Sequence, residues 1–540
     1  MSRKLMGRQW QLQSTMKINF SDQFEALVAK HGDREALVNV ERNRRYTFTE
    51  LHKLTNQIVN MISSILSLGE GDRFINILHN DNMALLHVLT ILKANATGVF
   101  TNSRDSLDEH ISQVDLVEPK VAFIENALLD SHYPMLRARG VTVVCMDPID
   151  EAREGLLYFW DLLEGVSDKN PNIEIDDCDH MMLIRFTGGT TGKGKAAYYC
   201  PQNWLCIKDS FYAMPDSDWE TSSRLLHISP ISHGTMLPLM PCFFSGGCSV
   251  TLNEPDLVKF CQTVEREKIT HSFSVPTVLY RLLELPQALE SDLSSLRSVF
   301  YGAAPMSPSK LKLLQEKFGN IFIQVYASTE HLPISLSLSK QAHQLEGPEG
   351  ESKLSAIGQV VSGIEVILMD DNGQPVEVGS PGEIWMRSRG TIDGYYKNPE
   401  ATEAEFIDGY WKSGDIAYQD DQGFIFMIDR KKDMIITGGF NVYSVEVESA
   451  INAHEAVLNC AVIGVPHEEW GESVHAEVIL RDSMSVDEKE LIAFVKEKLG
   501  GYKSPKSIKY VDQLPVSAVG KVLRREVRDK YWKKNERQLG

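Results

Sequence analysis

The stretch of this sequence best suited to chemistry is the glycine-rich loop from Phe186 to Ala196, FTGGTTGKGKA. Glycines let the backbone turn several N–H groups toward one point, threonines add hydroxyl donors, and lysines add positive charge. Such a donor set suits a polyphosphate, most simply a nucleoside triphosphate. The residues that supply it are Thr187, Gly188, Gly189, Thr190, Thr191, Gly192, Lys193, Gly194 and Lys195.

Part of this loop also fits the Walker A pattern G-x-x-x-x-G-K, from Gly189 to Lys195. Ala196 stands where that pattern needs a serine or threonine for Mg²⁺. A Walker loop also leads into a helix, whereas the stretches on both sides of this loop have the apolar pattern of strands. The sequence therefore predicts a phosphate-binding loop between two strands.

Composition limits the class of protein. With 540 residues, 43% of them hydrophobic, the chain should form at least two domains. Its net charge of −19 argues against a nucleic-acid partner. The basic segment after Lys521 is interpreted as a solvated terminal helix rather than a polyanion-binding surface.

Two further features concern location. No window approaches the ~20 apolar residues of a membrane-spanning helix, so we expect no transmembrane segment. The eight cysteines lack paired spacing, and the N-terminus lacks the apolar core of a signal peptide. We therefore expect reduced thiols and a cytoplasmic protein. A homodimer is left open.

The elements that must position the loop alternate between strand and helix, which predicts an α/β fold of mostly parallel, helix-covered sheets. One helix should begin at Thr47, in a capping box with Glu50, and end at Gly69. Residues 357–418 have the short strands and turn signals of a small β-barrel. We place a domain boundary in the charge run that follows, giving an N-terminal domain of residues 1–431 and a small α+β domain of residues 432–540.

Three other segments should lie at the carboxyl ends of strands, where ligands gather in such sheets. They are His233, the turn from Gly302 to Pro305, and the segment from Tyr326 to Glu330. We expect them to converge with the phosphate loop in one crevice.

Four separated segments together resemble motifs of the adenylate-forming (AMP-binding) superfamily, most closely its acyl-CoA synthetases and aryl-CoA ligases. The resemblance covers nearly the whole chain. Gly188 replaces the family's usual serine, and Gly194 and Ala196 flank Lys195 where proline and glycine are usual. The segments are the phosphate loop, YASTE (Tyr326 to Glu330), GYWKSGDIA (Gly409 to Ala417) and PVSAVGKVLRR (Pro515 to Arg525).

The resemblance implies ATP and Mg²⁺ as ligands. Tyr326 would stack on adenine, Thr329 would touch the α-phosphate, and Glu330 would hold Mg²⁺. Asp415 would accept hydrogen bonds from the ribose hydroxyls, supported by Arg430. The implied nucleotide-binding residues are Thr187, Gly188, Gly189, Thr191, Gly192, Ala303, Tyr326, Ala327, Ser328, Thr329, Asp415 and Arg430, with Thr190, Lys195, Glu330 and Lys521 as catalytic residues.

By the same resemblance, Lys521 would contact the reacting carboxylate and the α-phosphate. Lys432 would be the hinge about which a mobile C-terminal domain swings to admit a thiol. Gly438 and Gly439 would leave room for the pantetheine of CoA, and Trp470 and Tyr502 would clamp its adenine, with Lys503 and Lys506 near its phosphates.

His233 resembles the histidine at the mouth of the acyl pocket. No aspartate for a substrate amine occurs from Leu225 to Leu252. Gly302 and Ala304, with Ala303, would form a flat slot beside Met236 and Leu237, which suggests an aromatic or medium-chain acid.

Three hypotheses follow. The first is an ATP-dependent acid:CoA ligase, the second a stand-alone adenylating enzyme that loads a carrier protein, and the third a nucleotide-binding relative without catalysis.

Overall fold

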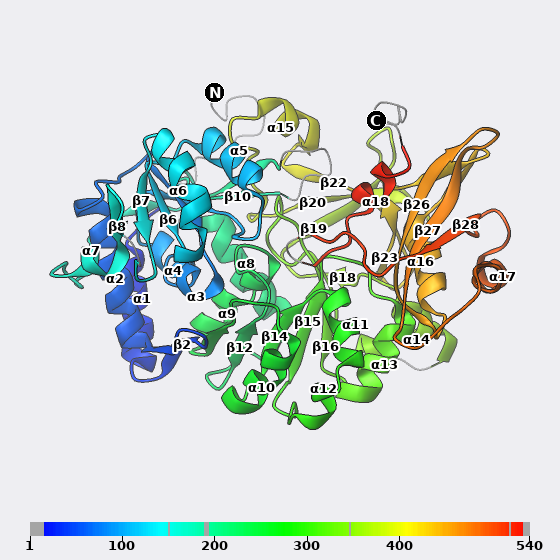
Figure 1. The fold of residues 1–540 in the computed structure, drawn as a ribbon, viewed down its shortest axis with the longest axis horizontal. Coiled ribbons are helices and arrows are strands. Elements are labelled where there is room, and N and C mark those ends of the chain that lie inside the picture. The colour runs from blue at the N-terminus through cyan, green and yellow to red at the C-terminus, as the bar shows by residue number, and fades with distance from the viewer. Residues whose placement is uncertain (1–15, 150–151, 188–193, 345–346, 518–519, 533–540) are drawn as a thin grey trace.

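The computed structural model describes residues 16–149, 152–187, 194–344, 347–517 and 520–532. Two large α/β sheets form the body, and two smaller sheets follow them in the chain (Figure 1). The predicted α/β fold with mostly parallel sheets is confirmed. In the described part of the chain, no helix is long and apolar enough to cross a membrane.

The first sheet has seven strands in the order β11-β10-β5-β4-β6-β7-β8. Its strands are parallel except for the antiparallel pair β10 and β11. The strands are β4 (Arg73–Ile77), β5 (Thr97–Phe100), β6 (Val121–Ile124), β7 (Thr142–Cys145), β8 (Leu156–Tyr158), β10 (Leu183–Phe186) and β11 (Ala196–Tyr199).

The second sheet has nine strands in the order β18-β17-β16-β15-β14-β12-β13-β2-β3, with a parallel centre and antiparallel edges. A short pair, β1 (Lys17–Ile18) and β9 (Ile175–Asp176), stands apart. The strands of the second sheet are β2 (Glu35–Asn39), β3 (Arg44–Thr47), β12 (Arg224–His227), β13 (Cys248–Thr251), β14 (His271–Ser274), β15 (Ser298–Gly302), β16 (Phe322–Tyr326), β17 (Leu336–Leu338) and β18 (Gln359–Val360).

Helices cover both sheets. Their bounds are α1 (Phe20–His31), α2 (Phe48–Ser64), α3 (Asn80–Met83), α4 (Val88–Ile91), α5 (Leu107–Val117), α6 (Leu129–Ala138), α7 (Phe159–Leu163), α8 (Pro201–Ala213), α9 (Leu239–Phe244), α10 (Leu257–Glu267), α11 (Pro276–Glu284), α12 (Gln287–Glu290), α13 (Pro308–Phe318) and α14 (Gly347–Lys353).

Helix α2 begins with the predicted capping box of Thr47 and Glu50. It ends at Ser64, not at Gly69 as the sequence predicted. Leu66 N–H bonds back to Met61 O, and Ser67 adopts the left-handed conformation with φ +55°. This local closure stops the helix before the glycine.

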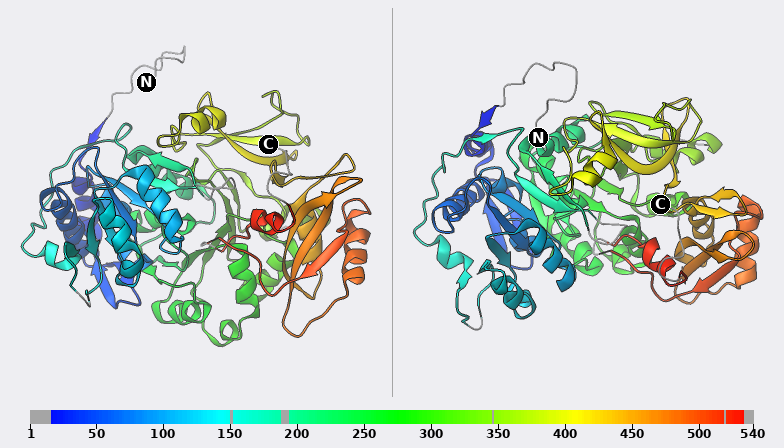
Figure 2. Two further views of the ribbon diagram at one scale, coloured as in Figure 1. Left: turned by 45° about the horizontal axis from the view of Figure 1, so that its top comes forward. Right: turned by 90° about the horizontal axis from the view of Figure 1, so that it is seen from above.

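Within the segment predicted to form a small β-barrel, residues 365–418 contribute to a five-stranded antiparallel sheet that extends to Arg430, whereas β18 joins the second large sheet. A second five-stranded sheet follows, with its own buried apolar cluster. It forms a lobe at the opposite end of the molecule from the first sheet (Figure 2). The elements of the two units are β19 (Glu365–Met369), β20 (Gly382–Arg387), α15 (Pro399–Glu405), β21 (Phe406–Ile407), β22 (Tyr410–Gln419) and β23 (Ile425–Arg430), then β24 (Ile435–Thr437), β25 (Phe440–Val442), α16 (Ser444–Asn452), β26 (Val457–His467), β27 (Gly471–Leu480), α17 (Glu488–Leu499), β28 (Ser507–Tyr510) and α18 (Arg524–Asp529).

The two large sheets are joined through Asn80, which is 4% exposed. Its amide nitrogen donates to Ser229 O at 2.9 Å and Leu252 O at 2.8 Å, and its amide oxygen accepts from Ile231 N–H at 2.9 Å. One side chain after a strand of the first sheet thus satisfies three backbone groups that follow strands of the second.

Replacing this amide should destabilise the protein. We expect Asn80→Ala to lower the free energy of unfolding by about 3 kcal/mol, because three buried backbone groups lose their partner. Asn60→Ala is the matched control, since Asn60 also donates to two backbone carbonyls, but at the surface. Its cost should stay below about 1 kcal/mol. The free energy of unfolding of both variants would be measured by chemical denaturation. An equal decrease in the two variants would contradict this role for Asn80.

Candidate active site

The phosphate loop connects β10 and β11, as the sequence predicted. Thr187 N–H donates to Lys195 O at 2.8 Å, and Lys195 N–H donates to Thr187 Oγ1 at 3.2 Å. A Cβ on Gly194 would lie 2.6 Å from Thr187 O, so only glycine fits where the two chain segments close. Gly188, Gly189, Thr190, Thr191 and Gly192 lie outside the described residues.

The side chain of Lys195 joins a cluster that the sequence did not reveal. Its Nζ lies 3.0 Å from the hydroxyl of Tyr395 and 2.5 Å from Glu405 Oε1. The Tyr395 hydroxyl is also within hydrogen-bonding distance of Glu330 Oε1, at 2.8 Å, and Glu405 Oε2, at 2.5 Å. One hydroxyl proton cannot serve both carboxylates at once, so they compete for it.

Glu330 is 7% exposed, and burial raises its pKa, while the hydrogen bond from Tyr395 and the charge of Lys195 act in the opposite direction. A hard carboxylate oxygen beside a phosphate loop fits Mg²⁺, which proteins often hold through one or two carboxylates plus phosphates. Among the residues described, no group of three or more metal-ligating side chains forms a cage. That Glu330 holds the ion stays a prediction.

A second polar cluster lies where β22 pairs with β23. The hydroxyl of Tyr326 donates to Asp415 Oδ2 at 2.7 Å, and Arg430 Nε lies 3.2 Å from Asp415 Oδ1. Asp415 Oδ1 is buried and accepts no hydrogen bond from any described residue. Because the ion pair with Arg430 leaves Asp415 Oδ1 without an aligned hydrogen bond, this oxygen can still accept one from a ligand hydroxyl, as the ribose interpretation requires.

Lys521 reaches this second cluster from the C-terminal lobe. Burial lowers its pKa to about 7, as does the positive charge of Arg430, while Asp415 acts in the opposite direction. The turn before it is closed by Gly520 N–H, which donates to Ser517 O at 2.8 Å. The charges of Asp415 and Arg430 both act on Lys521, so these three residues, predicted from separate motifs, lie within electrostatic range of one another.

The residues that follow β16, from Ala327 to Thr329, are fixed by hydrogen bonds and by apolar packing. The hydroxyl of Tyr199 donates to Thr329 O at 2.7 Å, and Ser328 Oγ accepts from His331 N–H at 2.9 Å. Ala327 packs against the large apolar core. The predicted nucleotide segment is thus anchored to β11.

Arg185 on β10 is another residue that sequence reasoning missed. It is buried, and its Nε donates to the carbonyl of Ser232 at 2.9 Å, next to His233. Burial and, to a smaller extent, the positive charge of Arg185 lower the pKa of His233 to about 3, so this histidine stays neutral. A charged residue in an otherwise apolar strand was the signal that could have identified it.

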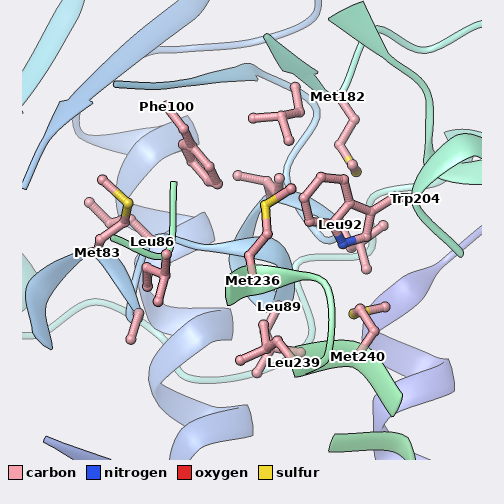
Figure 3. Packing of buried hydrophobic residues seen from close by; sticks show 14 of the residues in the cluster. Met83, Leu86, Leu89, Leu92, Phe100, Met182, Trp204, Met236, Leu239 and Met240 are labelled. Atoms are coloured by element: carbon pink, nitrogen blue, oxygen red, sulfur yellow. The ribbon is translucent and has the colours of Figure 1, made fainter. Parts of the chain in front are cut away.

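The residues predicted to line the acid pocket lie in or beside the large apolar core. Met236 and Leu237 are buried in the core, where Figure 3 places Met236 close to Met182, Trp204 and Met240. A Cβ on Gly302 would lie 2.2 Å from Val325 O, so the neighbouring strand already requires this glycine. Ala303 is left-handed with φ +63°. A slot for the acid beside Gly302 and Ala304 stays a prediction.

The residues predicted to bind CoA lie on the C-terminal lobe. Gly438 and Gly439 form the turn between β24 and β25 with φ of +55° and +82°, and Gly438 N–H donates to Trp470 O at 3.0 Å. Trp470 is 37% exposed and Tyr502 47%. The ring of Phe440, which the sequence did not identify, lies 5.2 Å from that of Tyr502.

Lys432 lies between the two small sheets, and its carbonyl accepts from Arg528 of α18 at 3.4 Å. The neighbouring Asp433 forms ion pairs with Arg524 and Arg528. Arg524 also pairs with Glu448 at 2.5 Å. The part of the basic tail that forms α18 is therefore mainly engaged within the protein, rather than solvated as the sequence suggested.

Comparison with known proteins gives two matches to family profiles. The profile of the AMP-binding enzyme matches residues 24–396, and that of the AMP-binding enzyme C-terminal domain matches residues 446–521. The medium/long-chain-fatty-acid–CoA ligase FadD8 of Mycobacterium tuberculosis is 32% identical over 434 residues, which cover 79% of this chain and 74% of that protein. The feruloyl-CoA synthase of an Amycolatopsis species is 35% identical over 373 residues, which cover 68% and 73%.

Solved structures agree with these relatives. ATP-bound MatB from Rhodopseudomonas palustris is 26% identical with a TM-score of 0.84, over 96% of this chain and 99% of that chain. The o-succinylbenzoate CoA synthetase MenE of Bacillus subtilis, in complex with the acyl-adenylate intermediate OSB-AMP, is 25% identical with a TM-score of 0.80, over 95% and 99%.

The cluster at Lys195 predicts a pH effect. In Tyr395→Phe, Glu330 loses a donor that lowers its pKa, so a larger fraction of this carboxyl is protonated at a given acidic pH. Calorimetric titration of Mg²⁺ with ATP should therefore show binding that is lost at a higher pH than in the wild type. Tyr396→Phe is the control and should leave the profile unchanged. Superimposable profiles for Tyr395→Phe and the wild type would contradict this coupling.

Proposed function

The chain belongs to the AMP-binding enzyme family, and from that premise we propose that it is an ATP-dependent carboxylic acid:CoA ligase working through an acyl-adenylate. The observation that carries the proposal is that Lys521, from the C-terminal lobe, lies within electrostatic range of the ion pair between Asp415 and Arg430. Asp415 could accept hydrogen bonds from the ribose of a bound nucleotide. The positive charge of Lys521 would then lie near the α-phosphate, where the reaction takes place.

The reaction begins with the approach of two anions, the carboxylate of the acid and the triphosphate of ATP. A carboxylate oxygen of the acid forms a bond to the α-phosphorus of ATP, and the bond from that phosphorus to the β-bridging oxygen breaks, releasing pyrophosphate. The thiolate of CoA then attacks the acyl carbon, and AMP leaves with the electron pair of the mixed anhydride. Because like charges repel, the first step depends mainly on neutralisation and positioning.

Residues of this chain would supply that neutralisation. Lys195 and the loop donors Thr187 and Thr190 would hold the β- and γ-phosphates, and Lys521 would contact the carboxylate and the α-phosphate. Asp415 and Arg430 would fix the ribose, with Tyr326 against the adenine. When bound at Glu330, Mg²⁺ would withdraw charge from the phosphates.

We also propose the division into residues 1–431 and 432–540, with a hinge at Lys432. A single lysine cannot occupy the phosphate site while a thiol approaches the same carbonyl, so a domain rotation would separate the two steps. Gly438, Gly439, Trp470 and Tyr502 would then bring CoA to the adenylate. The exposed rings of the last two suit an adenine base.

The acid is proposed to be apolar, aromatic or medium-chain. Several methionines line the buried cluster around Met236, and such side chains repack readily around varied apolar shapes (Figure 3). Two of the relatives are a medium/long-chain-fatty-acid–CoA ligase and a feruloyl-CoA synthase, which agrees with this class. His233 would stand at the mouth of the pocket as a neutral group.

The eight cysteines are all free, which supports a reducing compartment such as the cytoplasm.

A panel of acids with ATP, Mg²⁺ and either CoA or a carrier protein tests the function. We expect acid-dependent pyrophosphate release and CoA-dependent AMP release. Lys521→Ala should abolish the first half-reaction yet transfer a pre-made acyl-adenylate to CoA at close to the wild-type rate. AMP release that needs a carrier protein and ignores CoA would contradict the ligase, and ATP binding with no turnover of any acid would indicate the non-catalytic relative.

The pKa of Lys521 predicts a pH dependence for the first half-reaction. In the free enzyme the ammonium loses its proton as pH rises through about 7, so attraction for the carboxylate is present below that pH and lost above it. The kcat/KM for adenylate formation should therefore fall on the alkaline side with an apparent pKa near 7. Lys521→Arg, slower overall, should not show this fall, because guanidinium stays charged. An identical alkaline limb in both enzymes would contradict this assignment.

A further inference from the structure

Helices α11 and α13 of the second sheet's covering layer form the surface against which the C-terminal lobe lies. In Figure 1, both helices lie beside the lobe, and the chain leading to α18 runs toward them. Among the polar contacts that cross this boundary in the described part of the chain, two lie at opposite ends of α11 and one at the start of α13. Contacts at three separate points fix the orientation of a rigid body as well as its distance.

The first contact touches the turn that carries Lys521. The hydroxyl of Thr277, in the first turn of α11, donates to Gly520 O at 2.7 Å. Gly520 has φ +84°, and a Cβ there would lie 3.5 Å from Val275 and 3.7 Å from Thr277. The residue immediately before Lys521 is thus held on the start of α11.

The second contact buries a cation. Lys310, in the first turn of α13, is 2% exposed, and its Nζ donates to Val457 O at 2.7 Å. Val457 begins β26, which belongs to the lobe. Burial lowers the pKa of Lys310 to about 8, with Arg481 acting in the same direction. Lys310 is therefore covered by the docked lobe and would gain water if the lobe moved away.

The third contact is an ion pair between Glu284, at the end of α11, and Arg481, just after β27. Helix α11 has nine residues, so Thr277 and Glu284 stand about 10 Å apart along its axis. Two contacts this far apart oppose both tilting of the lobe and its dissociation from α11.

We infer that Thr277 is a positioning residue for adenylate formation: together with Lys310 and Glu284 it docks the C-terminal lobe so that Lys521 faces Asp415. This inference rests on the proposed function and adds to it the groups that hold the adenylate-forming arrangement. Neither helix supplies a residue to the predicted nucleotide or acid sites. The two helices would therefore determine how often the C-terminal lobe is docked, while Lys521 would act in the reaction itself.

The docking itself can be tested without substrate, using two lysines of α13 as reporters. Lys310 Nζ bonds to a carbonyl of the lobe, while Lys317 Nζ bonds at 2.7 Å to Leu283 O, within the same layer as α13. Acetylation by a lysine-reactive reagent, followed by mass spectrometry, should proceed at Lys310 only through the undocked state. Thr277→Val should speed modification of Lys310 about fivefold, the equivalent of one neutral hydrogen bond, and leave Lys317 unchanged.

Arg481→Gln gives a second, independent variant and should act in the same direction. An unchanged rate at Lys310 in both variants would overturn the docking role. Equal acceleration at Lys310 and Lys317 would also overturn it, since that indicates general loosening of α13.

The half-reactions then test positioning. Thr277→Val should slow pyrophosphate exchange, by at most about fivefold and by less the more the docked state predominates, and should not slow transfer of a pre-made acyl-adenylate to CoA. Lys317→Met, the matched control, should leave both unchanged. Equal loss of both half-reactions in Thr277→Val would contradict a positioning role. If the wild type exchanged no pyrophosphate with any acid, the proposed function would fail, while the acetylation result would still decide whether α11 and α13 dock the lobe.

Discussion

The constraint on which this structure depends is the approach of one anion to another in a place with little water. A carboxylate and a triphosphate repel each other, and the repulsion grows as solvent is excluded. In the proposed mechanism the cations come from different parts of the chain: Lys195 from the loop between β10 and β11, Arg430 from β23, and Lys521 from the C-terminal lobe. Burial lowers the pKa of Lys521 to about 7. The ammonium proposed to attract the carboxylate therefore loses its proton near neutral pH.

Carboxylates form ion pairs with two of these cations. Glu405 pairs with Lys195, and Asp415 pairs with Arg430. Tyr395 lies between Glu330 and Glu405 and can donate to only one of them at a time. Binding of a triphosphate would compete with Glu405 for Lys195, so the arrangement around Tyr395 couples nucleotide binding to the state of Glu330.

The sequence predicted much of this because the relevant signals are local. A loop rich in glycine between two apolar runs predicts a phosphate hairpin, and strands alternating with helices predict parallel sheets. The resemblance to a known family then connected Asp415, Arg430 and Lys521, which no spacing rule could bring together. The reason for Gly194 came only from the structure, since the approach of Thr187 O that excludes any Cβ depends on how the strands close.

Other features depend on packing between distant segments and have no sequence signature. Tyr395 and Glu405 lie in a stretch without a motif, yet both reach Lys195. The end of α2 at Ser64 is set by a left-handed serine, which overrode the glycine that the pattern favoured. The docking contacts of Thr277, Lys310 and Glu284 arise from two helices that look from sequence like ordinary covering elements.

The central claim is that the acid attacks the α-phosphorus of ATP, and the fate of the acid's oxygen tests it most directly. The acid would be labelled with heavy oxygen in both carboxylate positions, and the released AMP would be weighed by mass spectrometry after one turnover with CoA. The account predicts AMP that carries a single heavy oxygen, transferred when the acyl–adenylate bond forms and retained when CoA displaces AMP. Thioester formation with unlabelled AMP would contradict it.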